Sequence, residues 1–352
     1  MHGKALISLI YSVSRVGSSA GTGLGEYSKR LLKGLESIGV AIEPIEVTKR
    51  EYSIAGKPML GNLSLVVGTR IKRPAGNIVH SLSPEVIHPR TNVLTVHDII
   101  PLKLKEMFSG TYYRERGNKM IFDKINRIEH IISFTQSGKK DLVEIAGANK
   151  DRIDVVNQSI DHQAFYRDPN STLWEEGKKH ILTVGDLNPR KRYDLLFRAI
   201  GGDEQYQVLH VGPVNAWGTR RDELRSLIKD KSNVRMVGPV EQGVLRQYMS
   251  SADLLVHLSE AEGFGYTSIE AMACGTNVLV NDLEVFKETL GNKGFFTKLE
   301  EDAIRVDIEK AMGNLHKPSN LIEFSRQYSI ERMAESTVEV YRKVDPSIMK
   351  QQ

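Results

Sequence analysis

Two glutamates eight positions apart, Glu262 and Glu270, enclose a Gly-Phe-Gly turn and the start of a short predicted helix. Glycines let backbone N–H groups come close to a ligand, and a helix N-terminus favours negative charge such as a phosphate. Glu262 lies before the turn and can contact one end of a bound molecule, while Glu270 on the helix can contact the other end. A ligand with hydroxyls at both ends and phosphate between them, such as a nucleotide sugar, fits this arrangement.

A second candidate site follows the apolar strand predicted at 179–185. Pro189 tightens the loop, and Lys191 falls at the predicted start of the next helix. A cation is unfavourable there, because the dipole at a helix N-terminus prefers acids. A bound anion would remove this conflict. Lys191 is therefore a candidate phosphate ligand, with a solvated surface lysine as the alternative.

Two further segments belong to the first half of the chain. The glycine loop at 21–27 follows the first predicted strand and starts a helix, and it is consistent with a plain turn or with a phosphate contact. His97 ends a buried strand and precedes Asp98. A single histidine at a strand end is more often structural than functional.

The string from Glu262 to Gly275 closely resembles the E-x7-E signature of the retaining glycosyltransferases of family four, which have the GT-B fold and include many mannosyl- and glucosyltransferases. Other motifs of that family resemble five further segments, at 21–27, 93–102, 133–137, 155–161 and 184–196. The resemblance therefore runs from about residue 6 to residue 341.

The resemblance implies a role for each candidate. Glu262 would hold sugar hydroxyls and orient C1, Glu270 would bind the ribose, and His97 would lie beside the donor sugar. Lys191 and a neighbouring arginine would stabilise the departing diphosphate without a metal. No covalent nucleophile stands out, which implies same-face attack by the acceptor. The expected catalytic residues are Glu262, Lys191 and His97, and the expected donor-binding residues are Gly23, Arg190, Gly263, Phe264, Gly265, Tyr266, Thr267 and Glu270.

Three positions depart from the family pattern. Asp186 stands where many members carry an arginine, Asn157 replaces a usual proline, and Thr22 replaces the first glycine of its loop. An acid cannot contact a diphosphate favourably. The expected diphosphate clamp, formed by Lys191 and neighbouring arginines, therefore lacks one positive charge. Arg190 and Arg192 are both candidates to supply it.

The expected fold is α/β, a GT-B arrangement of two doubly wound Rossmann-like domains facing across a cleft. Short β-branched runs alternate with helical periodicity, as in parallel sheets covered by helices. The predicted strands are 5–11, 41–47, 78–81, 93–97, 130–134, 179–185, 208–212, 234–238, 253–258 and 277–281. The predicted helices are 25–38, 111–128, 137–146, 190–200, 219–228, 242–250 and 266–273, followed by final helices within 320–343.

The predicted domains follow the same pattern. Residues 1–165 form an acceptor-binding domain, 166–178 a polar linker, and 179–325 a nucleotide-sugar-binding domain. Residues 326–352 form a helix that, by resemblance, crosses back to the first domain. Ligands of doubly wound sheets bind at the carboxyl ends of the strands.

The composition points to a reducing compartment. Of 352 residues, 40% are hydrophobic, which suffices for two cores. The only cysteine, Cys274, excludes a disulfide framework. No apolar run approaches the ~20 residues of a membrane span, and residues 1–13 are typical of a buried strand and not of a signal peptide. We expect a cytosolic protein, or one on the cytosolic face of a membrane.

The net charge of +4 is unevenly distributed, since nine Lys/Arg and four acids lie between Lys103 and Lys140. This segment is a solvated helix face or a surface attracted to anionic lipid or to a phosphorylated acceptor. A peripheral contact with an anionic membrane is thus a candidate interaction. Nucleic acid is not an expected partner, because no binding module accompanies the charge.

The sequence therefore predicts a retaining hexosyltransferase, of mannose or glucose type, that uses a GDP- or UDP-sugar and a glycan or lipid-linked glycan acceptor. No cofactor and no metal is expected, since metal-ligand spacings, a P-loop and a G-x-S-x-G elbow do not occur. The His97 segment favours GDP-mannose. A nucleotide-sugar epimerase and a non-catalytic sugar-nucleotide-binding protein remain as alternatives.

Overall fold

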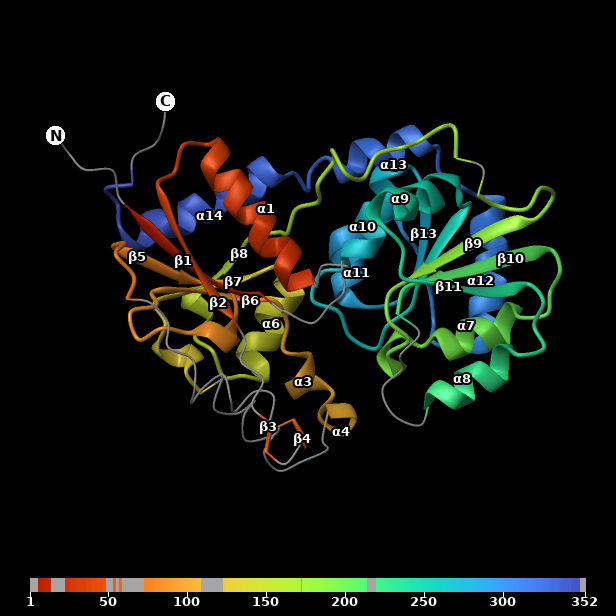
Figure 1. The fold of residues 1–352 in the computed structure, drawn as a ribbon, viewed down its shortest axis with the longest axis horizontal. Helices are drawn as coiled ribbons and strands as arrows, with labels where there is room; N and C mark the ends of the chain where they lie inside the picture. Colours follow the sequence, from red (N-terminus) through yellow and green to blue (C-terminus); the bar gives the residue numbers. More distant parts are fainter. Residues whose placement is uncertain are drawn as a thin grey trace. The chain divides into compact units, whose positions relative to one another are not determined.

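The computed structural model describes residues 6–13, 23–48, 53–54, 57–58, 73–108, 123–171, 173–213 and 220–348. The chain divides into two compact units (Figure 1). The first unit comprises Met1–Ser159 and Ile330–Gln352, and the second unit comprises Ile160–Ser329. Each unit contains a six-stranded sheet. The expected α/β class with two doubly wound sheets is confirmed.

The sheet of the first unit has the strand order β2-β1-β5-β6-β7-β8, and all neighbouring strands are parallel. Its strands are β1 (Ile7–Val13), β2 (Ile42–Thr48), β5 (Ile78–Ser81), β6 (Val93–Val96), β7 (His130–Ser133) and β8 (Ile153–Val155). A short antiparallel pair, β3 (Ser53–Ile54) and β4 (Lys57–Pro58), stands apart. Apolar side chains on both faces of the central strands are buried, as parallel sheets require.

The helical segments of the first unit are α1 (Gly23–Ser37), η1 (Pro84–Val86), α3 (Ile100–Lys103), α4 (Lys105–Phe108), η2 (Ile125–Arg127), α6 (Gln136–Glu144), η3 (Lys150–Arg152) and α14 (Ile330–Val344). The side chain of Thr135 caps α6 by accepting a hydrogen bond from the Gly138 N–H. The helix predicted at 111–128 lies mostly outside the described residues, and its described end is the 3-10 turn η2.

Helix α14 packs along α1 in the first unit (Figure 1). The contact is tight at Gly34, where a Cβ atom would lie 2.9 Å from Ala334 Cβ and 2.9 Å from the Ile330 carbonyl oxygen. A buried polar chain also ties α14 to the sheet, because His80 Nδ1 lies 2.8 Å from the Tyr341 hydroxyl. The last helix of the chain is therefore an integral part of the first unit.

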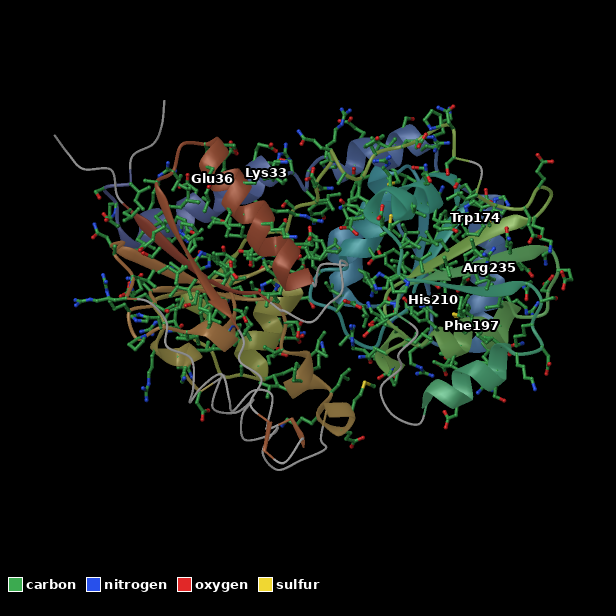
Figure 2. All side chains as sticks on the ribbon, in the orientation of Figure 1. Lys33, Glu36, Trp174, Phe197, His210 and Arg235 are labelled. Carbon is green, nitrogen blue, oxygen red and sulfur yellow. The ribbon has the colours of Figure 1, made fainter. Side chains whose placement is uncertain are left out.

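The sheet of the second unit has the order β11-β10-β9-β12-β13-β14, again with parallel neighbours. Its strands are β9 (Lys179–Val184), β10 (Tyr206–Val211), β11 (Val234–Gly238), β12 (Leu254–His257), β13 (Asn277–Asn281) and β14 (Phe295–Thr297). Its helical segments are η4 (Pro189–Lys191), α7 (Tyr193–Ile200), α8 (Arg220–Ile228), α9 (Gln242–Ser251), α10 (Tyr266–Ala273), α11 (Glu284–Leu290), η5 (Gly291–Lys293), α12 (Glu301–Gly313) and α13 (Pro318–Ser325). Phe197 of α7 and His210 of β10 are among the side chains in its interior (Figure 2).

The strand order of the second unit reverses between β9 and β12. The chain proceeds from β9 outward to β11, returns to β12 beside β9, and then proceeds outward to β14. The loops that follow β9 and β12 therefore diverge at the carboxyl edge of the sheet. Such a reversal is where open α/β sheets leave a crevice for a ligand.

The segment predicted as a linker, 166–178, packs within the second unit against α9. The Ser171 hydroxyl donates to the Gln247 carbonyl at 2.7 Å. The Trp174 indole N–H donates to the Ser251 hydroxyl at 3.0 Å, and its ring stacks on His180. The described residues of this segment are thus ordered by polar contacts to one unit.

The close approach of α1 and α14 leads to a stability prediction. We expect Gly34→Ala to lower the free energy of unfolding by about 1–3 kcal/mol, because the new methyl group overpacks a contact that includes backbone. This loss should exceed the ~1 kcal/mol that alanine gains over glycine in a helix. Urea unfolding followed by circular dichroism measures the difference.

Gly243 in α9 provides the matched control, because a Cβ atom there meets no neighbouring atom within 4 Å. Gly243→Ala should leave stability unchanged or raise it by up to about 1 kcal/mol. Equal effects of the two substitutions would contradict the packing argument.

Candidate functional site

The loop after β9 presents Lys191 at the end of a 3-10 turn. The Asn188 side chain accepts a hydrogen bond from the Arg190 N–H at 3.0 Å and so caps η4. Arg192 then adopts a left-handed conformation with φ 47°, and α7 begins only at Tyr193. The helix predicted at 190–200 is therefore wrong at its start. Lys191 precedes α7, so the expected conflict with the helix dipole does not arise.

The loop after β12 lies directly against this turn. The Glu260 N–H donates to the Arg190 carbonyl oxygen at 2.9 Å, which ties the two loops together through the backbone. The Ser259 N–H donates to the Asn281 side chain at 2.8 Å, which anchors the second loop to the end of β13. Both loops are thus fixed at the carboxyl edge of neighbouring strands.

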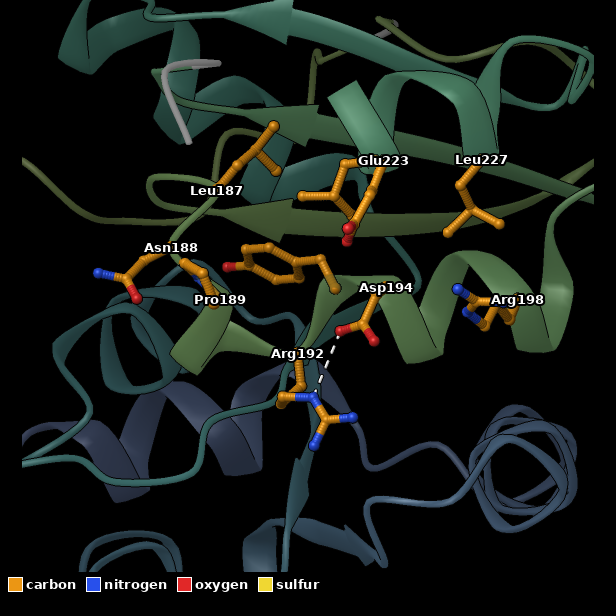
Figure 3. Close-up of a pocket in the computed structure, with 10 residues that line it drawn as sticks. Leu187, Asn188, Pro189, Arg192, Asp194, Arg198, Glu223 and Leu227 are labelled. Atoms are coloured by element: carbon orange, nitrogen blue, oxygen red, sulfur yellow. Dashed lines mark hydrogen bonds and ion pairs between the residues drawn. The ribbon is translucent and has the colours of Figure 1, made fainter. Parts of the chain in front are cut away.

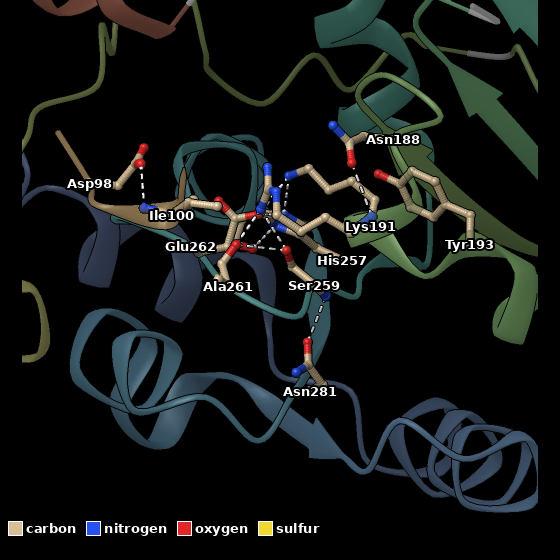
Figure 4. A network of polar contacts seen from close by, with 12 residues as sticks. Asp98, Ile100, Asn188, Lys191, Tyr193, His257, Ser259, Ala261, Glu262 and Asn281 are labelled. Atoms are coloured by element: carbon tan, nitrogen blue, oxygen red, sulfur yellow. Dashed lines mark hydrogen bonds and ion pairs between the residues drawn. The ribbon is translucent and has the colours of Figure 1, made fainter. Parts of the chain in front are cut away.

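Glu262 is the centre of the site (Figure 4). Its Oε1 atom accepts hydrogen bonds from Lys191 Nζ at 2.7 Å and from Arg190 Nη1 at 2.7 Å, and it lies 3.3 Å from His257 Nε2. The side chains of Glu262 and Lys191 are 11% exposed, and that of Arg190 is 14% exposed. The structure therefore brings together three of the predicted residues and adds His257, which the sequence did not indicate.

The electrostatics of this cluster favour a bound anion. Burial alone would raise the pKa of Glu262, but the Lys191 and Arg190 charges hold it well below its ordinary value, so the carboxylate is ionised. Burial, followed by the Lys191 charge, lowers the pKa of His257 to about 4, so this ring is neutral at pH 7. The cluster therefore contains two cations, Lys191 and Arg190, one anion, Glu262, and a neutral imidazole. It has one net positive charge, and its side chains are largely buried.

The structure distinguishes the two candidate arginines. Arg190 Nη1 also donates to the Ser259 hydroxyl at 2.7 Å, whereas Arg192 pairs with Glu260 at 3.1 Å and Asp194 at 3.3 Å. Arg190 is therefore the arginine of the Glu262 cluster. Asp186 has no hydrogen bond or ion pair to the part of the chain that the structure describes.

Helix α10 begins at the turn beside Glu262. Gly265 caps it with φ 89°, and a Cβ atom there would lie 2.8 Å from Phe286 Cε1, so only glycine fits. The half-buried residues of this segment are Gly263, Tyr266, Thr267 and Glu270. In contrast, the Phe264 side chain is 3% exposed and packs on the Tyr328 ring, which leaves only its backbone for a ligand contact.

His97 and Gly23 belong to the first unit. His97 Nε2 lies 3.0 Å from the Leu82 carbonyl oxygen, so this nitrogen carries the proton and Nδ1 is an acceptor. The Tyr27 and Phe134 rings pack edge-on against the imidazole, each with its centroid 4.9 Å away. Gly23 is the exposed first residue of α1.

A row of glycines lies at the ends of three strands: Gly185 follows β9, Gly212 follows β10, and Gly238 is the last residue of β11. All three have positive φ, and a Cβ atom on Gly212 would lie 1.9 Å from the Gly185 carbonyl oxygen. A Cβ atom on Gly185 would lie 4.0 Å from Lys191 Cε. A side-chain-free edge of backbone therefore borders the lysine.

A pocket of about 220 Å³ lies on the α7 and α8 side of the same loop (Figure 3). Its apolar part consists of leucines, and its polar part carries both signs of charge. The lining residues are Leu187, Asn188, Pro189, Arg192, Tyr193, Asp194, Arg198, Glu223, Leu224 and Leu227. The sequence indicated neither this pocket nor the glycine row, because both depend on which strands and helices are neighbours.

Among the described residues, no three His, Cys, Asp or Glu side chains gather in a way that could hold a metal ion. None of the helices within the described ranges is both long enough and apolar enough to cross a membrane.

Comparison with known proteins places this geometry in a family context. Residues 165–328 match the family model described as "Glycosyl transferases group 1". The chain is 24% identical to the O-antigen chain mannosyltransferase RfbU of Salmonella typhimurium strain LT2, over 84% of this chain and 88% of that protein. It is 30% identical to the D-inositol 3-phosphate glycosyltransferase of Nocardia farcinica, over 54% of this chain but only 46% of that relative's length.

Solved structures share the fold. Sucrose-phosphate synthase (tll1590) from Thermosynechococcus elongatus has a TM-score of 0.76 at 19% identity and covers 97% of this chain and 100% of its own. Anabaena Alr3699/HepE in complex with UDP-glucose has a TM-score of 0.70 at 17% identity, over 96% of this chain and 100% of its own. The fold is therefore GT-B, and residues 165–328 are similar to the group 1 glycosyltransferases.

The buried histidines lead to a pH prediction. Burial lowers the pKa of His80 to about 3 and those of His97, His210 and His257 to about 4. The unfolded chain, with histidine pKa values near 6.5, therefore binds more protons between pH 4 and 6.5. The contribution of these neutral rings to the free energy of unfolding is fully present above this window and is lost as the pH falls through it. From pH 7 to pH 5 the loss is roughly 2 kcal/mol per histidine.

Urea unfolding at pH 5, 6 and 7 measures this dependence. His210→Asn keeps an amide near Thr183 but cannot take up the proton, so it should remove about a quarter of the slope. Equal unfolding free energies at pH 5 and pH 7 would show that these rings take up protons in the folded state as readily as in the unfolded chain.

Proposed function

We propose that the chain is a retaining hexosyltransferase. It moves a sugar of the mannose or glucose type from a nucleotide diphosphate sugar to a hydroxyl on a glycan or a lipid-linked glycan. The observation that carries the proposal is the buried cluster at the strand reversal of the second unit, in which Arg190 and Lys191 share the Glu262 carboxylate. The names of the relatives, a mannosyltransferase among them, agree with this class of reaction.

The two cations are the residues that stabilise the leaving group. A lysine ammonium has three donors. Two of those on Lys191 contact Glu262 and His257, and the third has no acceptor among the described residues. A diphosphate that accepts this N–H gains a charge-assisted bond at a place with net positive charge. Charge developing on the leaving diphosphate is stabilised by groups already in position, without a metal.

Glu262 is suited to hold the sugar. The hydrogen bonds that it accepts from Lys191 and Arg190 are both made by Oε1, and Oε2 accepts none from the described residues. The low pKa of Glu262, maintained by Lys191 and Arg190 against the effect of burial, keeps Oε2 as a pure acceptor. Sugar hydroxyls are donors, so Oε2 can orient the hexose while Oε1 keeps the cations ordered.

The remaining predicted residues take supporting roles in this proposal. The turn at Gly263 and the first turn of α10, with Tyr266 and Thr267, offer backbone N–H groups near the phosphates, and Glu270 offers a carboxylate to the ribose. His97 offers its Nδ1 acceptor to a donor hydroxyl. GDP-mannose is the first donor to test, because of the His97 segment, and UDP-glucose is the second, because HepE binds it.

The acceptor is proposed from the relatives and the sequence. RfbU is named for O-antigen chains, and the structural neighbour WaaG is described as acting in lipopolysaccharide biosynthesis. Both agree with a glycan or lipid-linked acceptor. The proposed peripheral contact with an anionic membrane rests on the basic excess between Lys103 and Lys140, of which 109–122 lie outside the described residues.

One experiment separates the proposal from its two rivals. Purified protein is incubated with GDP-mannose or UDP-glucose, with and without candidate acceptors, and free nucleotide and products are quantified by mass spectrometry. Release of nucleotide only with an acceptor supports the transferase. Conversion of the donor to a stereoisomer without an acceptor would indicate an epimerase, and binding without turnover would indicate a binding protein.

The clamp is tested by nucleoside diphosphate binding. We expect Lys191→Ala and Arg190→Ala each to weaken GDP or UDP binding roughly ten- to a hundredfold, because each removes a charged hydrogen bond of about 1.5–3 kcal/mol. Arg192→Ala is the matched control, since Arg192 pairs with Glu260 and Asp194 instead. Asp186→Arg should do no more than slight harm. Titration calorimetry gives the affinities, and an unchanged affinity in Lys191→Ala would remove that residue from the clamp.

Glu262→Gln should separate binding from turnover. The amide keeps the shape but removes the charge, so turnover should fall roughly ten- to a hundredfold. GDP or UDP affinity should hold or increase, because the two cations lose their counter-ion. Glu260→Gln, which changes the neighbouring pair with Arg192, should keep near-normal turnover. Wild-type turnover in Glu262→Gln would disprove the assigned role.

A further inference from the structure

His257 connects three parts of the second unit. It is the last residue of β12, and its side chain is 3% exposed. Its Nδ1 lies 2.9 Å from the Ser268 hydroxyl on α10, and its Nε2 lies 3.0 Å from Lys191 Nζ. The Phe286 ring of α11 packs edge-on against the imidazole at 5.1 Å.

The partners of the ring determine its tautomer. A lysine ammonium can only donate, so Nε2 must be the unprotonated nitrogen that accepts from Lys191. The ring proton then lies on Nδ1 and is donated to Ser268 Oγ. The opposite tautomer would direct an N–H toward Glu262 Oε1 at the longer distance of 3.3 Å, and it would place that N–H against the ammonium.

This tautomer has a consequence for Lys191. Fixing a lysine side chain costs rotamer entropy, and a single carboxylate contact leaves the ammonium able to rotate. With Glu262 and His257 as two separate acceptors, the position of Nζ and the direction of its third N–H are both set. The ring adds an acceptor without adding a negative charge, so the net positive charge of the cluster is kept.

We propose that His257, held as the Nδ1–H tautomer by Ser268, is a positioning residue that fixes the Lys191 ammonium for a diphosphate group. This inference rests on the proposed function. His257 itself touches no reacting atom in this scheme. It acts through Lys191.

The readout is the preference for a nucleoside diphosphate over the monophosphate, for GDP against GMP and for UDP against UMP, measured by titration calorimetry. We expect His257→Leu to lower this preference about five- to tenfold, because Lys191 keeps its charge but its third N–H is no longer held in one direction. Lys191→Ala should lower it at least as much. Monophosphate affinity should change little in both variants.

Two amides of different length provide the control. Glutamine carries its amide oxygen as many bonds from the backbone as Nε2, whereas asparagine carries it only as far as Nδ1. His257→Gln should therefore restore most of the diphosphate preference, and His257→Asn should not. Equal behaviour of the two variants, at equal thermal stability, would mean that the histidine only fills space.

The tautomer is tested without any ligand. ¹⁵N NMR of the histidine side chains, assigned by difference with His257→Gln, should show an unprotonated Nε2 and a protonated Nδ1 at pH 7. Ser268→Ala should weaken the preference for the Nδ1–H tautomer. A protonated Nε2 in the wild-type protein would overturn the inference.

The outcomes also separate this inference from the proposed function. If wild-type protein prefers the diphosphate and Lys191→Ala loses the preference while His257→Leu keeps it, the clamp stands and the positioning role falls. If neither diphosphate binds the wild-type protein more tightly than its monophosphate, the proposed function and the positioning role fall together.

Discussion

The pairing of the Glu262 carboxylate with Lys191 and Arg190 is the interaction around which the site of the second unit is arranged. A buried carboxylate is costly by several kcal/mol unless it is paired and hydrogen-bonded, and here Lys191 and Arg190 both bond to one of its oxygens. These partners come from a different loop, so the pairing requires β9 and β12 to be neighbours and their loops to be tied together. The strand reversal, the left-handed Arg192 and the glycine cap of α10 all lie next to this pairing.

The cluster also explains how a diphosphate could be bound without rearranging buried charges. The cations are ordered by the protein before any ligand arrives, and the site has one more positive than negative charge. Preorganised charges of this kind need little reorganisation at the moment of reaction, which is why they stabilise a developing anion so effectively. In the proposed function, Glu262 would keep two roles apart on its two oxygens, since Oε1 holds the cations and Oε2 is left to face a donor.

Much of this architecture was predictable from the sequence. The bounds of β5, β11, β13 and α10 were predicted as they are found, because apolar runs and punctuating glycines define them locally. The predicted start of α7 was wrong because the side-chain cap at Asn188 and the left-handed conformation of Arg192 depend on tertiary contacts, which local sequence does not show. The strand β14 and helices α11 and α12 were not predicted, and β14 has only three residues. His257 was missed because a single polar residue within an apolar strand is indistinguishable from a core position until its neighbours are known.

The choice of histidine at this position follows from charge and geometry together. A leucine would leave an ammonium N–H of Lys191 unpaired in a buried place, which is costly. A glutamate would satisfy that N–H but would cancel the net positive charge on which the proposed diphosphate binding depends. A protonated histidine would repel Lys191, and burial together with the Lys191 charge prevents that state at neutral pH by lowering the pKa to about 4. A neutral imidazole, oriented by Ser268, meets all three constraints, because it offers one acceptor, one donor and no charge.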